Sequence, residues 1–186
     1  DNKNLPVYLF MAVVVSLFMG MSVSAEEIFK DRRILERESF LNLSRMSYIN
    51  SKIFFLFCLS AFQSLSFVLV GNFILEIQGM TFYYWAILFT TSCFANMVGL
   101  NISSALNSII TIYILIPFIL VPQLLLGGAM IKFDELHKNL AKQAQVPLVG
   151  DVMASRWAYE ALSVAQFRYN DYEEHFFQHE KKMSQY

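Results

Sequence analysis

Charged residues are scarce in this sequence, and long stretches contain none. Only 16% of the 186 residues are Asp, Glu, Lys or Arg, whereas soluble domains average about 25%. No charge occurs between Lys3 and Glu26, between Lys52 and Glu76, or between Glu76 and Lys132. A membrane-spanning helix needs about 20 predominantly apolar residues, so the first two gaps each hold one span and the third holds two. The composition therefore predicts a polytopic membrane protein of the all-α class, built as a helical bundle.

The features of several other protein classes are also missing. With a net charge of −1, the chain lacks the basic surface that nucleic acids require, so no nucleic-acid partner is predicted. Cys58 and Cys93 both fall within apolar runs, which argues against a disulfide framework. No Walker, G-x-S-x-G or H-E-x-x-H motif occurs, so no catalytic residue is predicted. His175 and His179 have the i, i+4 spacing of a metal site, but two ligands are too few, and no metal is predicted.

The apolar runs predict four spanning helices within residues 1–131. Their ranges are residues 6–24, 53–74, 80–102 and 109–131. The first run ends in small residues, as a signal peptide does, but it is long for a signal core and lacks a basic flank, so a span is favoured. Basic residues in short loops mark the cytoplasmic side, and the loop 25–52 is the richest in them. We therefore predict a multi-pass protein of the cell membrane, plasma or bacterial inner, with both ends of the chain outside and the lipid bilayer as a partner.

Residues 25–52 form the only long charged segment in the first two-thirds of the chain. Lipid cannot solvate these ions, so the segment must lie in water at one membrane surface. Apolar residues recur among the charges at roughly helical spacing. The pattern fits an amphipathic surface helix and a solvated loop equally well, and both remain open.

The second half of the chain predicts a bent helix followed by an external segment. Pro117 and Pro122 interrupt the fourth span, so a kinked helix suited to lining a pore is expected. Residues 132–165 begin polar and then become apolar with interruptions, too broken to span, which predicts an external re-entrant segment. Residues 166–186 are predicted to form an external polar tail.

Short motifs along the chain match those of one membrane-protein family. They are Ser22-Val23-Ser24-Ala25 with Glu27-Ile28-Phe29, Arg32-Arg33, Glu36-Arg37-Glu38, Phe40, Ser47-Tyr48 with Ser51-Lys52, Gly99-Leu100-Asn101-Ile102-Ser103-Ser104, Leu126-Gly127-Gly128, and Ser155-Arg156-Trp157-Ala158-Tyr159-Glu160-Ala161-Leu162. From about Pro6 to Leu162 the chain resembles the transmembrane domain of ABC-2 type transporters, closest to the G subfamily of ABC exporters. The resemblance implies an ABC-2 type bundle with a cytoplasmic coupling helix, at about residues 36–45, and an external re-entrant motif.

The resemblance also implies partners and residue roles. ATP and Mg²⁺ would be bound by a separate nucleotide-binding domain, in the same or another chain, and the membrane-spanning part itself would bind no cofactor. A second copy of the permease would complete a homodimer. The implied site residues are Glu27, Arg33, Glu36, Arg37, Glu38, Phe40, Arg45 and Tyr48 for coupling to the ATPase domain; Phe18, Pro117, Pro122, Leu125, Leu126, Ala129 and Met130 for the translocation path; and Arg156, Trp157 and Glu160 for the re-entrant motif.

Two other classes of function compete with the leading one. The leading prediction is the membrane-spanning permease of an ATP-binding cassette transporter, an exporter that couples ATP hydrolysis elsewhere to translocation. The alternative is a non-transporting scaffold or sensor whose charged loop docks a cytoplasmic partner. An intramembrane enzyme is disfavoured because the spans lack paired ionisable groups. The substrate does not follow from the sequence.

Overall fold

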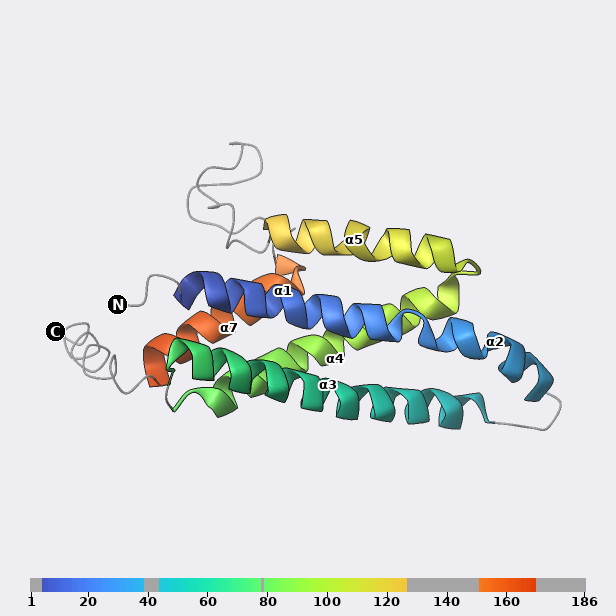
Figure 1. Cartoon of the computed structure of the whole chain (residues 1–186). Coiled ribbons are helices and arrows are strands. Elements are labelled where there is room, and N and C mark those ends of the chain that lie inside the picture. Colours follow the sequence, from blue (N-terminus) through green and yellow to red (C-terminus); the bar gives the residue numbers. More distant parts are fainter. Residues whose placement is uncertain (1–4, 39–43, 78, 127–150, 170–186) are drawn as a thin grey trace.

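The computed structural model describes residues 5–38, 44–77, 79–126 and 151–169, and every element in these ranges is an α-helix (Figure 1). The helices are α1 (Leu5–Ser24), α2 (Glu27–Glu38), α3 (Arg45–Leu75), α4 (Thr81–Ala105), α5 (Ile109–Leu126) and α7 (Ala154–Tyr169). The predicted all-α class is confirmed. Of the two alternatives left open for the charged segment 25–52, a helix and a solvated loop, the structure has a helix over Glu27–Glu38.

Three of these helices are long and apolar enough to cross a membrane, namely α1, α3 and α4. α5 is a fourth apolar helix of 18 residues, and residues 127–131, the end of its predicted span, lie outside the described residues. The helix α5 continues through Pro117 and Pro122. α2 lies at one end of the bundle, whereas α7 lies in the opposite half (Figure 1).

Two helices extend beyond the spans that were predicted for them. α3 begins at Arg45 rather than at residue 53, because Ser44 is extended and its hydroxyl accepts a hydrogen bond from a backbone N–H of the first turn. α4 continues through Ser103 and Ser104, past residue 102, where its predicted span ended. The predicted spans stop at the first polar residues, because they were drawn from the apolar runs. A helix continues beyond that point as long as its backbone N–H and C=O groups find hydrogen-bond partners.

α4 is the central helix, and it contacts each of the other five helices in the described part of the chain. Its contact with α1 is the most extensive, and small residues make it close. A Cβ atom added at Gly20 would lie 2.7 Å from the carbonyl oxygen of Ser92, and one added at Gly99 would lie 2.9 Å from that of Met21. The backbones of α1 and α4 therefore approach each other at two points where only glycine fits.

Polar groups within the spans bond between helices. The hydroxyl of Ser16 in α1 donates to the carbonyl oxygen of Leu88 in α4 at 2.8 Å. On the other side of α4, the Asn96 amide donates to the Ser60 hydroxyl of α3 at 2.7 Å, and the Trp85 indole donates to the Ala61 carbonyl oxygen at 3.0 Å. Such bonds contribute about 0.6 kcal/mol each within a membrane. They fix α1 and α3 against α4.

α7 packs one face between α1, α4 and α5 in the half of the bundle away from α2 (Figure 1). The Ser155 hydroxyl donates to the Gln123 carbonyl oxygen of α5 at 2.5 Å, and Gln166 is hydrogen-bonded to Tyr84 of α4. The boundary predicted between re-entrant segment and tail, at residue 165, thus falls inside a packed helix. The rest of both predicted segments, 132–150 and 170–186, lies outside the described residues.

Candidate functional site

Four side chains from α2 and α3 converge at the α2 end of the bundle. The Lys52 ammonium lies 2.8 Å from a carboxylate oxygen of Glu27 and 2.8 Å from one of Asp31. The Tyr48 hydroxyl donates to the same Asp31 oxygen at 2.8 Å. We call Glu27, Asp31, Tyr48 and Lys52 the ionic junction. It ties α2 to α3 across the loop that separates them.

The spacing of these residues explains how two helices form the ionic junction. Glu27 and Asp31 are four residues apart in α2, and Tyr48 and Lys52 are four residues apart in α3. Residues at i and i+4 lie one above the other on one helix face, so each helix presents a pair of groups to the other. One ammonium between two carboxylates leaves the ionic junction with one net negative charge.

The electrostatics of the ionic junction favour its charged form. α3 is apolar from Ile53 onward, so Lys52 lies just beyond the lipid-length part of the helix. The hydrogen bond from Lys52 holds the pKa of Asp31 below its ordinary value; burial acts against this, and the bond from Tyr48 adds to it. Burial acts to lower the pKa of Lys52, but its bonds to Asp31 and Glu27 outweigh burial and raise it.

α2 is also fixed to the end of α4. The backbone N–H groups of Ile28 and Phe29 donate to the Ser103 hydroxyl at 3.1 and 2.9 Å. The first turn of a helix has unpaired N–H groups, and Ser103 caps them from a neighbouring helix. Arg32 donates to the Asn107 side chain just beyond α4. The start of α2 therefore cannot shift without moving α3 and α4.

The outward side of α2 carries basic and apolar groups. Arg33 and Arg37 are exposed, and Ile34 between them is 43% exposed. Met46, at the start of α3, is 71% exposed. A surface that combines guanidinium groups with uncovered apolar side chains has the composition of a protein contact.

The structure separates the residues predicted for coupling into three groups. Glu27 and Tyr48 belong to the ionic junction, whereas Arg33, Glu36 and Arg37 are exposed on α2. Glu38 and Arg45 lie in helices, but their side chains are outside the described part, as is all of Phe40. The coupling helix expected at about residues 36–45 falls partly outside the described residues. α2 covers Glu27–Glu38, residues 39–43 are not described, and Ser44 is extended just before α3.

The residues predicted for the translocation path are described only in part. Phe18 on α1 and Pro117 and Leu125 on α5 are exposed, and Pro122 is half-buried. For Leu126 only the backbone is described, and Ala129 and Met130 lie outside the described residues.

The residues of the predicted re-entrant motif form a surface cluster at the start of α7. Arg156 bonds to Asp151 and lies 3.7 Å from a Glu160 carboxylate oxygen. The Trp157 indole donates to the Asp151 carbonyl oxygen at 2.8 Å, and Arg156 stacks over its ring. The cluster lies where α7 begins, beside the end of α5 (Figure 1).

Asp31, Lys52 and Ser103 are site residues that sequence reasoning missed. The i, i+4 pair of Glu27 and Asp31 was a usable signal, because two carboxylates on one helix face attract a cation. Ser103 gave no such signal, since its partners are backbone groups of a helix far away in the sequence.

The bundle and its charged end define a class of protein: a multi-pass helical membrane protein with a charged helix fixed at one end. Residues 1–167 match the family model described as ABC-2 type transporter, so the chain belongs to the ABC-2 type transporter family. As an ABC-2 membrane domain it is the non-catalytic permease component of an ABC transporter in the cell membrane. The match concerns the family as a whole and not the G subfamily. The searches of curated proteins and of solved structures found no match.

Proposed function

We propose that this permease is the exporting membrane half of an ATP-driven transporter, and that α2 with the ionic junction couples it to a nucleotide-binding domain. In this proposal the α2 end of the bundle is cytoplasmic, and the chain works as a homodimer. The observation that carries it is the attachment of one surface helix to two others. α2 is bonded to α3 through Lys52 and to α4 through Ser103.

The mechanism follows from this geometry. A nucleotide-binding domain that rests on Arg33, Ile34 and Arg37 would displace α2 when it closes. Since α2 is held at two points, the displacement passes to the ends of α3 and α4 rather than being absorbed by a flexible loop. The resulting tilt of the spanning helices would change access to a path along α1 and α5. Among the described side chains of α2, the exposed charges are three basic residues and one acidic residue, Glu36, so this face suits a mainly acidic partner surface.

The test compares two lysine variants of the complete transporter in proteoliposomes. Lys52→Met removes the cation between α2 and α3 and should lower transport-stimulated ATP hydrolysis about tenfold, the effect of losing a typical coupling energy between two sites. Lys52→Arg is the matched control, because it keeps a cation within reach of the Glu27 and Asp31 carboxylates. The control variant should retain full stimulation.

A second variant addresses docking itself. Arg37→Glu reverses a charge on the exposed face of α2 and leaves the ionic junction intact, so it should weaken assembly with the nucleotide-binding domain. Normal stimulation of ATP hydrolysis in both Lys52→Met and Arg37→Glu, with both proteins inserted and assembled, would contradict the coupling role. Unchanged assembly and ATP hydrolysis without any transport would favour the scaffold alternative.

A further inference from the structure

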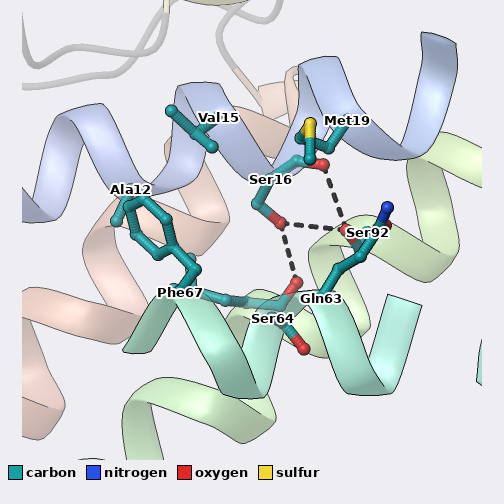
Figure 2. Close-up of a pocket in the computed structure, with 9 residues that line it drawn as sticks. Ala12, Val15, Ser16, Met19, Gln63, Ser64, Phe67 and Ser92 are labelled. Carbon is teal, nitrogen blue, oxygen red and sulfur yellow. Dashed lines mark hydrogen bonds between the residues drawn. The ribbon is translucent and has the colours of Figure 1, made fainter. Parts of the chain in front are cut away.

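A pocket lies in the middle of the bundle, at the junction of α1, α3 and α4. α1 and α3 each pack along α4 and meet each other where Tyr8 stacks on Phe67. Between them lies a pocket of about 50 Å³, shown in Figure 2. Leu88 and Ser92 of α4 are buried at its floor, whereas Val15 and Met19 of α1 are 36% and 41% exposed at its rim. The pocket is therefore open at the outer surface of the bundle.

The pocket opens toward lipid rather than water. Ser16 lies near the middle of α1, and Gln63 lies near the middle of the apolar run that begins at Ile53. Both are about ten residues, or 15 Å, from the ends of their spans, which is half the thickness of the hydrocarbon layer. None of the described residues of the predicted translocation path lines this pocket. A molecule in it would have to arrive from the bilayer.

Only one polar group in the pocket remains available to a ligand as a donor. The hydroxyls of Ser16, Ser92 and Ser64 donate to the carbonyl oxygens of Leu88 (2.8 Å), Ser16 (3.1 Å) and Ser60 (2.7 Å). The Gln63 amide makes no hydrogen bond within the described part of the chain. Its side chain extends from α3 toward the α1 side of the pocket (Figure 2). A primary amide without a partner in lipid is costly, and a ligand oxygen would satisfy it.

We propose that this pocket binds the end of a slender, uncharged alcohol that enters from the bilayer, with its hydroxyl oxygen accepting a hydrogen bond from Gln63. A charged group is excluded, because ions at mid-depth are too costly. A water molecule occupies about 30 Å³ in the liquid, so a pocket of about 50 Å³ admits only a few heavy atoms, such as a chain end. The rest of the molecule lies in the bilayer, beyond the rim that Val15 and Met19 form.

Photolabelling of the complete transporter in lipid nanodiscs tests this proposal. The probe is octan-1-ol with a diazirine at carbon 3, and labelled residues are mapped by mass spectrometry. We expect labelling at Val15, Met19 and Phe67 that excess octan-1-ol suppresses and octane does not. Gln63→Leu should weaken this labelling about fivefold, the effect of losing one hydrogen bond. Ser66→Ala, which removes an exposed hydroxyl from the same helix, should leave it unchanged.

Two controls keep the result decisive. A diazirine-bearing alkane without a hydroxyl should label exposed Phe73 equally in all variants, which shows that the bundle remains folded. The proposal is overturned if Gln63→Leu labels as strongly as the wild type. It is also overturned if octane competes as well as octan-1-ol. Cross-links from Met19→Cys to another helix of the transporter would overturn it too, since a protein segment would then cover the pocket. None of these outcomes depends on whether ATP drives transport.

Discussion

At the scale of single residues, Asp31 accepts two hydrogen bonds at one carboxylate oxygen, and this governs how pH affects the ionic junction. Its pKa is lowered in the folded protein, so its contribution to stability is present above its ordinary pKa and is lost as the pH falls. The pKa of Lys52 is raised, so the contribution of Lys52 is lost only at high pH. Between about pH 5 and about pH 9 both groups stay charged.

We therefore expect Asp31→Asn to lower the stability of the purified protein by a constant amount from about pH 5 to about pH 9. The loss should be about 1 kcal/mol, because both side chains are roughly a quarter exposed. Melting temperatures of the variant and the wild type, measured across this range, provide the check. A difference that grows or vanishes near neutral pH would show that another titrating group controls the ionic junction.

The glycines between α1 and α4 are the second residue-scale constraint. A Cβ at residue 20 would lie 2.7 Å from a backbone oxygen, so α1 and α4 would have to separate. We expect Gly20→Ala to destabilise the protein by about 1–3 kcal/mol, the usual range for overpacking. Thermal unfolding in detergent measures this, with Ser66→Ala on the exposed face of α3 as the control. Equal melting temperatures for the two variants would mean that the helices are not in close contact.

At the scale of helices, the sequence predicted the middles of the elements better than their ends. Apolar runs locate α1, α3 and α4 because lipid requires about 20 consecutive apolar residues. They do not predict that α3 starts at Arg45, since the cap from Ser44 adds polar turns that hydropathy cannot distinguish from a loop. The sequence also could not predict that the four residues of the ionic junction meet. One pair lies on α2 and the other on α3, and the relative position of these helices depends on their packing against α4.

The central position of α4 leads to a prediction about helix dynamics. α4 contacts the other five described helices, whereas α5 makes few contacts and carries two prolines. Local opening requires less free energy where fewer contacts are broken. In hydrogen–deuterium exchange of the transporter in nanodiscs, we expect peptides of α4 to exchange slowest, and those of α5 fastest, among the apolar helices α1, α3, α4 and α5. Exchange in α5 as slow as in α4 would show that α5 is covered on the face that is exposed in the single chain.

At the scale of the whole molecule, α2 and α7 lie in opposite halves of the bundle (Figure 1). If α2 meets a nucleotide-binding domain in the cytoplasm, the end of α7 must lie outside. Ser47 and Arg168, both exposed, are suitable positions for single cysteines in a background without Cys58 and Cys93.

We expect a membrane-impermeant maleimide to label Arg168→Cys in intact cells and Ser47→Cys only after permeabilisation. The reason is that α3 begins near Ser47 at the α2 end, whereas α7 ends near Arg168 at the opposite end of the bundle (Figure 1). Labelling of Ser47→Cys in intact cells would place α2 outside the cell and remove the proposed contact with the nucleotide-binding domain. The family membership would be unaffected, because it depends on the sequence match alone.

The length of α3 has a mechanical consequence. Its 31 residues form a single rod about 46 Å long, longer than the hydrocarbon layer of about 30 Å. α4 is bonded to α3 near its middle, through Asn96 and Ser60, and again near its end, through Thr81 and Asn72. The two helices are therefore expected to tilt together when the end of α3 at Lys52 is displaced. A rotation of about 10° would swing the two tips roughly 4 Å in opposite directions. A small displacement at the Lys52 end of α3 would thus produce a displacement of similar size at the other end, without bending of the helix.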